Sequence, residues 1–228
     1  MESMIKVMDL VQKIGRQIIF NGLSFNVLPG ECFGVFGLRG AGKTTLLHIL
    51  AGVDRFKSGR VEVLGYDVKK SEKFKRDLGL VTQEKSLFQD MTVAENLDFL
   101  AAVKNAPRAN IYQMVERFAL NDLLAKPVTL LDMGSYQRLS MACALLNQPK
   151  LLIIDELIKD FDLYSQNLIK KELHQFQAEG GTCVYSFSNI ALCAQMSKVG
   201  WLESGRLQIY EPESALEEWD RQIKLYAE

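Results

Sequence analysis

The sequence predicts an α/β fold: a core with a mostly parallel sheet, an N-terminal antiparallel β subdomain and an inserted α-helical subdomain. Three observations predict this class. Strand-like runs separated by turn residues open the chain, and strand and helix patterns alternate at both ends. Helical patterns alone fill the stretch from Thr92 to about Leu146. Alternating strands and helices indicate a parallel sheet covered by helices, so the helical stretch is expected as an insertion.

The N-terminal part consists of strand-like runs and turns. A hairpin turn is expected at Asn21-Gly22, because Asn-Gly between apolar runs is a hairpin signal. Cys32–Phe36 is a short apolar run, typical of a strand buried on both faces. The leucines and isoleucine of Thr44–Leu50 then predict a helix packed on that strand. The first strands are expected at Lys6–Val11, Ile18–Phe20 and Leu23–Val27.

The remaining elements follow in order. Thr92 and Glu95 form a capping-box pattern at the start of the helical stretch, which predicts a helix beginning there. A second buried strand is expected directly after Pro149, and a polar helix ends at Gly180-Gly181. Further strands are expected at Val61–Leu64, Leu78–Thr82, Leu151–Ile154 and Cys183–Phe187, helices at Tyr164–Glu179 and Glu213–Glu228, and a hairpin at Val199–Ile209 turning at Ser204-Gly205.

The composition is that of a globular protein. The chain has 228 residues, of which 48% are hydrophobic and 24% charged, enough to bury a substantial core. A formal net charge of −1 argues against nucleic acid as a partner. No segment approaches the roughly 20 apolar residues of a membrane helix, so a membrane-spanning partner would be a separate chain. Reduced thiols in a cytosol are expected, because no two cysteines are closely spaced: Cys32, Cys143, Cys183 and Cys193.

A glycine-rich loop follows the first buried strand. Its sequence, Gly-Leu-Arg-Gly-Ala-Gly-Lys-Thr, matches the phosphate-loop pattern G-x-x-x-x-G-K-[ST]. Glycines let backbone N–H groups approach a phosphate, and the following helix directs its N-terminal dipole at the anion. A glycine-rich turn that binds nothing is the alternative, and the strand–loop–helix context disfavours it. Lys43 is expected to reach the β- and γ-phosphates and Thr44 to ligate Mg²⁺. The nucleotide-binding residues expected here are Gly37, Arg39, Gly40, Ala41, Gly42, Lys43, Thr44 and Thr45.

Two acids end the second buried strand. Asp155 and Glu156 follow four apolar residues, and a buried strand end is unfavourable for paired carboxylates unless a cation or proton chemistry requires them. Asp155 fits a Mg²⁺ contact through water, and Glu156 fits a general base for an attacking water. Alone, the pair would favour a solvated strand end. Following a phosphate loop, it favours catalysis.

These ordered motifs resemble those of the ATP-binding-cassette (ABC) ATPases, and the resemblance covers nearly the whole chain. Residues 80–83, Leu-Val-Thr-Gln, are similar to the glutamine loop, which in that family senses Mg²⁺ and touches the membrane partner. The resemblance implies three catalytic residues, Gln83, Glu156 and Lys43. It also implies that Gln83 contacts Mg²⁺. The family is a P-loop NTPase. The resemblance implies one nucleotide-binding domain over residues 1–228, with its core at about 1–83 and 147–228 and its helical subdomain at about 84–146.

Departures from the family pattern concern contacts to the nucleotide. The signature Leu-Ser-Gly-Gly-Gln falls on residues 131–135, where Asp132 replaces the serine and Met133 a glycine. Asp132 is still a good helix N-cap, so the helix is expected and the contact to the opposite subunit's γ-phosphate is not. The switch histidine falls on Asn189, or on Phe187 with another gap placement. The chain's two histidines, His48 and His174, are expected to be structural.

Three further positions differ. Ile14, which is aliphatic, falls near the aromatic residue that stacks on adenine in the family. After Glu156, the Pro-Thr-Ser-Gly-Leu-Asp of the family becomes residues 157–162, which retain only the final Asp. Arg39 stands where an asparagine or serine is common. The phosphate loop, the magnesium ligand and the base are nevertheless kept, whereas residues that act on the transition state or on the opposite subunit are altered.

This mixture implies a subunit that binds Mg·ATP, hydrolyses it slowly, and drives or regulates a membrane transporter through ATP-dependent dimerisation. The expected partners are a second nucleotide-binding subunit, with a heterodimer favoured over a homodimer, and an integral membrane permease subunit. The alternative is a catalytically weak or inactive ATP-binding subunit of a heteromeric assembly. Soluble cassettes of translation or DNA repair, which carry two cassettes, coiled coils or basic surfaces, are disfavoured. The expected location is cytoplasmic, on the inner face of the cell membrane.

Overall fold

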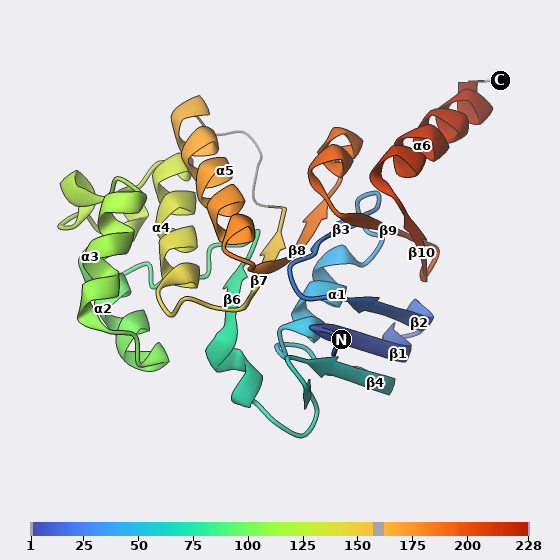
Figure 1. The fold of residues 1–228 in the computed structure, drawn as a ribbon, viewed down its shortest axis with the longest axis horizontal. Coiled ribbons are helices and arrows are strands. Elements are labelled where there is room, and N and C mark those ends of the chain that lie inside the picture. Colours follow the sequence, from blue (N-terminus) through green and yellow to red (C-terminus); the bar gives the residue numbers. More distant parts are fainter. Residues whose placement is uncertain (1, 157–161, 228) are drawn as a thin grey trace.

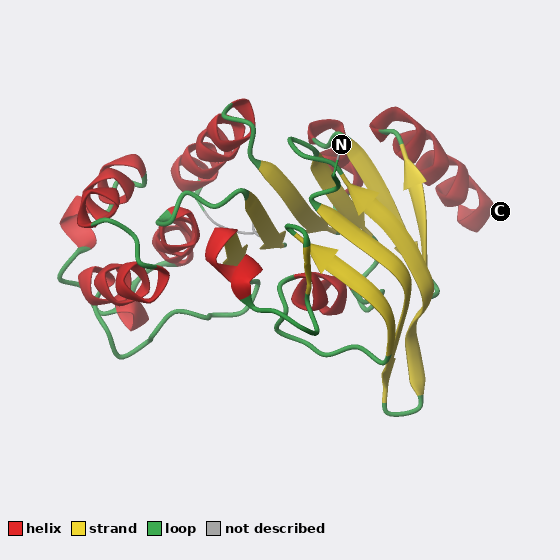
Figure 2. Ribbon diagram, turned by 60° about the horizontal axis from the view of Figure 1, so that its bottom comes forward, coloured by secondary structure: helices red, strands yellow, loops and turns green. Residues whose placement is uncertain are grey.

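The computed structural model describes residues 2–156 and 162–227 of the chain. It contains two sheets and a group of helices (Figures 1 and 2), which confirms the predicted fold class. The four-stranded antiparallel sheet has the order β2-β1-β4-β5, and the six-stranded sheet has the order β10-β9-β3-β8-β7-β6. The antiparallel sheet consists of β1 (Ile5–Ile14), β2 (Gln17–Val27), β4 (Ser58–Val63) and β5 (Tyr66–Asp67).

The predicted turn at Asn21-Gly22 is wrong. The hairpin between β1 and β2 turns at residues 15–16, and β2 runs without interruption through Asn21 and Gly22. Two consecutive residues of β1 pair with Leu23 and Asn21, which leaves Gly22 as the extra residue of a β-bulge with a φ of 78°. A glycine bulge uses the same left-handed backbone as a tight hairpin turn, so Asn-Gly fits either structure.

The six-stranded sheet positions the candidate site. Its five strands other than β10 are parallel to one another, and β10 is antiparallel to β9. β3 and β7 are buried along their whole length, as predicted. The carboxyl ends of parallel strands meet at one edge of a sheet, where ligands of open α/β sheets bind. The strands are β3 (Cys32–Phe36), β6 (Leu78–Val81), β7 (Leu151–Asp155), β8 (Thr182–Phe187), β9 (Lys198–Glu203) and β10 (Arg206–Tyr210).

Helices bury both faces of this sheet. α1 (Lys43–Leu50) shares one apolar core with the antiparallel sheet and the inner faces of β3 and β7, and the other helices share a second core. Figure 1 shows α2–α4 grouped at one end of the molecule and α6 at the other. Among the described residues, no helix is long and apolar enough to cross a bilayer. The other α-helices are α2 (Val93–Lys104), α3 (Arg108–Arg117), α4 (Met133–Leu145), α5 (Leu163–Ala178) and α6 (Pro212–Ala227).

The cysteines depart in part from the prediction of reduced thiols. Cys32 on β3 and Cys183 on β8 stand opposite each other, with Cα atoms 4.7 Å apart, and form a disulfide. The prediction is wrong for this pair because 151 residues separate it in sequence, so only the strand register brings it together. Cys143 and Cys193 are free and buried. Burial raises the pKa of the Cys143 thiol to about 12 and the pKa of Cys193 to about 11, which keeps both unreactive.

Candidate functional site

The glycine-rich loop connects the carboxyl end of β3 to the start of α1, as predicted. Gly40 and Gly42 adopt φ values of 86° and 102°, a region that side chains disfavour. A Cβ atom on Gly42 would also lie 2.8 Å from Ile19, and one on Gly37 would lie 2.7 Å from the carbonyl oxygen of Leu202. No side chain caps α1, so its first amides face the loop without a protein partner of that kind. A helix start of this kind suits a phosphate.

The side chain of Lys43 folds back over its own loop. Its Nζ donates to the carbonyl oxygens of Gly37 at 2.9 Å and Leu38 at 3.3 Å, and it lies 3.2 Å from Oε1 of Glu156. The residue is 6% exposed. The ammonium therefore lies where the phosphate loop meets the end of β7. The loop and the first turn of α1 together hold the predicted residues Gly37, Arg39, Gly40, Ala41, Gly42, Lys43, Thr44 and Thr45.

Asp155 ends β7 and is 1% exposed. One carboxylate oxygen, Oδ1, accepts a hydrogen bond from the hydroxyl of Ser186 on β8. The other, Oδ2, is buried and has no hydrogen-bond partner among the described residues. A buried carboxylate oxygen is costly without a hydrogen bond or a cation, so this atom fits a site for a hard cation.

Glu156, the next residue, is held at several points. Its backbone has a φ of 45°, and its N–H donates to the carbonyl oxygen and to Oγ of Ser186. Its side chain is 9% exposed, and Oε2 accepts from Nε2 of Gln83 at 3.4 Å. Oε1 faces Lys43 and accepts a hydrogen bond from the hydroxyl of Ser188. The structure thus brings Lys43 and Gln83 to the adjacent acids Asp155 and Glu156, which lie far from both in sequence. A carboxylate placed here can take a proton from a water near a bound phosphate.

Comparison with known protein families identifies the family of this chain. Residues 20–159, more than half of the chain, match the family of ABC transporters. The chain belongs to the ABC transporter family. It is an ABC-type ATPase.

Relatives and solved structures extend the likeness beyond the matched residues. Over 219 residues the cassette is 26% identical to the lantibiotic transport ATP-binding protein SrtF of Streptococcus pyogenes, covering 94% of this chain and 95% of that protein. It is 34% identical over 178 residues to the Nod factor export ATP-binding protein I of Rhizobium sp. (strain N33), covering 76% and 59% of the two chains. A dimeric cassette in a post-hydrolysis state with ADP and Pi has a TM-score of 0.83 at 21% identity, covering 92% of this chain and 99% of that one, which supports the fold.

Residues 131–135, where the ABC signature is expected, lie at the start of α4. Asp132 is the N-cap, as predicted: its Oδ1 accepts from the backbone N–H of Ser135 at 2.8 Å, and its Oδ2 accepts from the Ser135 hydroxyl at 2.9 Å. The backbone hydrogen bond is the main reason that the pKa of Asp132 lies below its usual range. Asp132 is therefore ionised at neutral pH, and the amide of Ser135 is already occupied by an anion from the same chain. The replaced residues 157–161 lie outside the described residues.

Asn189, at the expected position of the ABC switch histidine, has a local role. Its side chain accepts from the N–H of Ala191 at 3.1 Å and caps the short helix that follows. The residue that reaches Glu156 is Ser188, one position earlier, and sequence reasoning missed it. The alternation of Ser186 and Ser188 after the apolar run of β8 was the available signal, since residues two apart share one side of an extended chain.

Ile14, expected near the adenine, lies at the end of β1 and is 59% exposed. Ile19, of the same hairpin, borders Gly42 of the phosphate loop. His48 on α1 lies 3.5 Å from Asp54, and His174 lies on α5.

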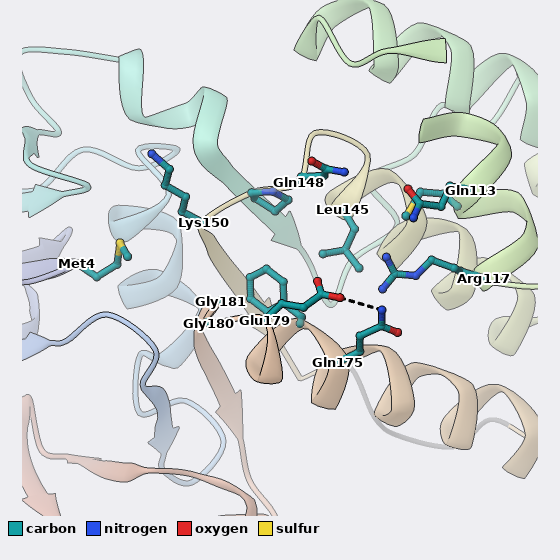
Figure 3. Close-up of a pocket in the computed structure, with 13 residues that line it drawn as sticks. Met4, Gln113, Arg117, Leu145, Gln148, Lys150, Gln175, Glu179, Gly180 and Gly181 are labelled. Carbon is teal, nitrogen blue, oxygen red and sulfur yellow. Dashed lines mark hydrogen bonds between the residues drawn. The ribbon is translucent and has the colours of Figure 1, made fainter. Parts of the chain in front are cut away.

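A separate cavity of about 570 Å³ lies at the opposite end of β7 (Figure 3). Lys150, which directly precedes β7, borders it together with Arg117 from α3 and the C-terminal end of α5. Figure 3 shows the hydrogen bond of 2.9 Å from Gln175 to Glu179 at its wall. None of the predicted nucleotide-site residues lines it, because Asp155 and Glu156 lie at the other end of the strand.

Proposed function

We propose that the chain is the ATP-binding subunit of a membrane transporter, which it drives or regulates through ATP-dependent dimerisation. The observation that carries the proposal is the meeting of Lys43 and Glu156, 3.2 Å apart, beside the phosphate loop. A phosphate-binding cation and a base adjoining one loop are what hydrolysis of a terminal phosphate requires. The names of the relatives, which describe ATP-binding proteins of transport and export, support the transporter assignment.

The residue roles follow from the geometry. The loop from Gly37 to Thr45 would hold the phosphates through its amides and Lys43, with Ile14 near the base. Thr44, Asp155 and Gln83 would hold Mg²⁺, and the orphaned Oδ2 of Asp155 supports that assignment. When bound, Mg²⁺ neutralises phosphate charge and orients the nucleotide. Glu156 would act as general base.

Two kinds of partner complete the proposal. One is an integral membrane permease subunit, which would place the chain in the cytoplasm on the inner face of the cell membrane. The other is a second nucleotide-binding subunit. A heteromeric pair with an intact cassette is favoured, because the carboxylate of Asp132 occupies the start of α4, where the family offers hydroxyl and amide groups to the partner's γ-phosphate. The same observation supports the alternative, a catalytically weak regulatory subunit.

The decisive experiment measures ATP turnover by the native assembly, purified through this subunit, for the wild type and for Glu156→Gln. Glu84→Gln, an exposed acid on the neighbouring loop, is the matched control. Loss of turnover in Glu156→Gln with normal turnover in the control supports hydrolysis at this chain's own site. Unchanged turnover in Glu156→Gln would refute the role of Glu156 and favour the regulatory alternative.

A further inference from the structure

We infer that Ser188 is a positioning residue for ATP hydrolysis: its hydroxyl holds the carboxylate of Glu156 in place. The inference rests on the proposed function, because it takes Glu156 as the base. It assigns a role to a residue that neither the phosphate loop nor the strand-end acids predict. The contact itself joins Oγ of Ser188 to Oε1 of Glu156 across 32 residues of sequence.

Two serines, Ser186 near the end of β8 and Ser188 just after it, contact different parts of the end of β7. Ser186 donates to Asp155 and accepts from the backbone N–H of Glu156 at 3.1 Å, so it fixes the main chain there. Ser188 stands two residues further on and reaches the carboxylate of Glu156. Ser188 lies at a bend directly after β8, and its hydroxyl also reaches the end of β7. The backbone of Glu156 and its side chain are therefore held by the same neighbouring segment.

Ser188 matters most when a nucleotide is bound. In the structure, Lys43 also contacts Oε1 of Glu156, and phosphates would draw that ammonium toward themselves. The carboxylate then keeps its hydrogen bonds from Ser188 and from Gln83. The Gln83 contact, at 3.4 Å, is at the long end for a hydrogen bond, so Ser188 is the firmer anchor. A base must be held in a productive geometry to act, and a loosened carboxylate loses rate without losing the nucleotide.

The position also bears on the switch histidine that the chain lacks. That histidine is expected at Asn189, or at Phe187 with another gap placement, and the side chain of Asn189 caps the following turn. Ser188 supplies a hydroxyl to the base from the adjacent position. The hydroxyl is neutral, so it orients Glu156 but does not supply a positive charge. Other groups must stabilise the negative charge of the transition state.

The test compares Ser188→Ala and Ser188→Thr in the native assembly, with ATP turnover measured over a range of ATP concentrations. A hydrogen bond to a charged group predicts a kcat about ten- to a hundredfold lower in Ser188→Ala, with KM changed less than about twofold. Ser188→Thr keeps the hydroxyl and should retain kcat within about threefold. Ser24→Ala, which removes an exposed hydroxyl on β2, should leave both constants unchanged. Thermal melting of each variant identifies any general loss of folding.

Adding Ser188→Ala to Glu156→Gln separates this inference from the proposed function. If Ser188 acts through Glu156, the double variant turns over no more slowly than Glu156→Gln alone. A normal kcat in Ser188→Ala, when Glu156→Gln has lost turnover, would overturn the inference and leave the proposed function standing. A raised KM with unchanged kcat would also overturn it, since that result indicates a role in binding. Full turnover in Glu156→Gln would refute this inference together with the role of Glu156 as base, and would favour the regulatory alternative of the proposed function.

Discussion

The ion pair between Lys43 and Glu156 predicts that removing the carboxylate of Glu156, the proposed base, strengthens ATP binding. Without nucleotide, the ammonium of Lys43 lies 3.2 Å from Glu156 in a site where both side chains are less than a tenth exposed. A nucleotide has to take Lys43 from this partner. Glu156→Gln removes the competing charge and keeps the size of the side chain. We therefore expect tighter ATP binding from a variant that has lost turnover.

The expected gain follows from the distance. At 3.2 Å the attraction between two unit charges is about 5 kcal/mol for an effective dielectric constant of about 20. Most of this is offset, because the carboxylate recovers hydration and its hydrogen bonds from Ser188 and Gln83 persist. A net gain of about 1–2 kcal/mol, or roughly five- to thirtyfold in Kd, is expected.

Isothermal titration calorimetry with Mg·ATP measures this change directly. Glu84→Gln, which removes an exposed negative charge from the nearby loop, should change Kd by less than about twofold. Buried pairs are screened by salt far less than surface charges, so the gain in Glu156→Gln should persist at about 0.5 M NaCl. Equal or weaker binding by Glu156→Gln would refute the reasoning. A gain that disappears in salt would assign it to long-range surface charge.

Three other predictions concern stability, each measured by urea unfolding. Arg117→Met leaves the carboxylate of Glu172, which is 2% exposed and paired with Arg117, without its cation, and should cost about 3–5 kcal/mol; adding Glu172→Met should recover much of it. Thr92→Ala removes the capping box of α2 and should cost about 1 kcal/mol. Hydrogen bonding from Ser135 lowers the folded-state pKa of Asp132. The ionised carboxylate therefore stabilises the fold above its unfolded pKa, and this stabilisation is lost as pH falls through the folded pKa. Asp132→Asn should flatten the dependence of unfolding free energy on pH below about pH 5.

The sequence predicted those parts of the site whose structure depends on residues close together in the sequence. The phosphate loop is one continuous segment whose glycines, lysine and threonine define the strand–loop–helix unit, and the structure confirms that unit from Cys32 to Leu50. The two fully buried strands were recognisable because strands covered on both faces need unbroken apolar runs. The capping of α2 by Thr92 and of α4 by Asp132 depends on residues within one helical turn.

Contacts set by strand register lay beyond the sequence. Ser188 reaches Glu156 only because β7 and β8 are neighbours with a particular alignment, and the same is true of Cys32 and Cys183 between β3 and β8. These strands are parallel, so long crossover connections separate them in sequence and no short turn sets which residues face each other. The misassigned turn at Gly22 has a related cause, since a left-handed backbone residue fits a bulge as well as a turn.

The start of α4 shows how a fold can keep its structure while losing a contact. Free amides and the helix dipole at an N-terminus attract an anion, and Asp132 supplies one from within the chain. The same amides and dipole would otherwise be available to a phosphate on another subunit, which would now meet a carboxylate of like charge. The chain's own phosphate loop, with Asp155 and Glu156, involves none of these groups. Its capacity to bind and hydrolyse ATP and its capacity to complete a partner's site are therefore physically independent. That independence favours the heteromeric pairing proposed above. A partner with an intact signature segment can complete the ATP site of this chain, although the start of α4 cannot do the same for the partner.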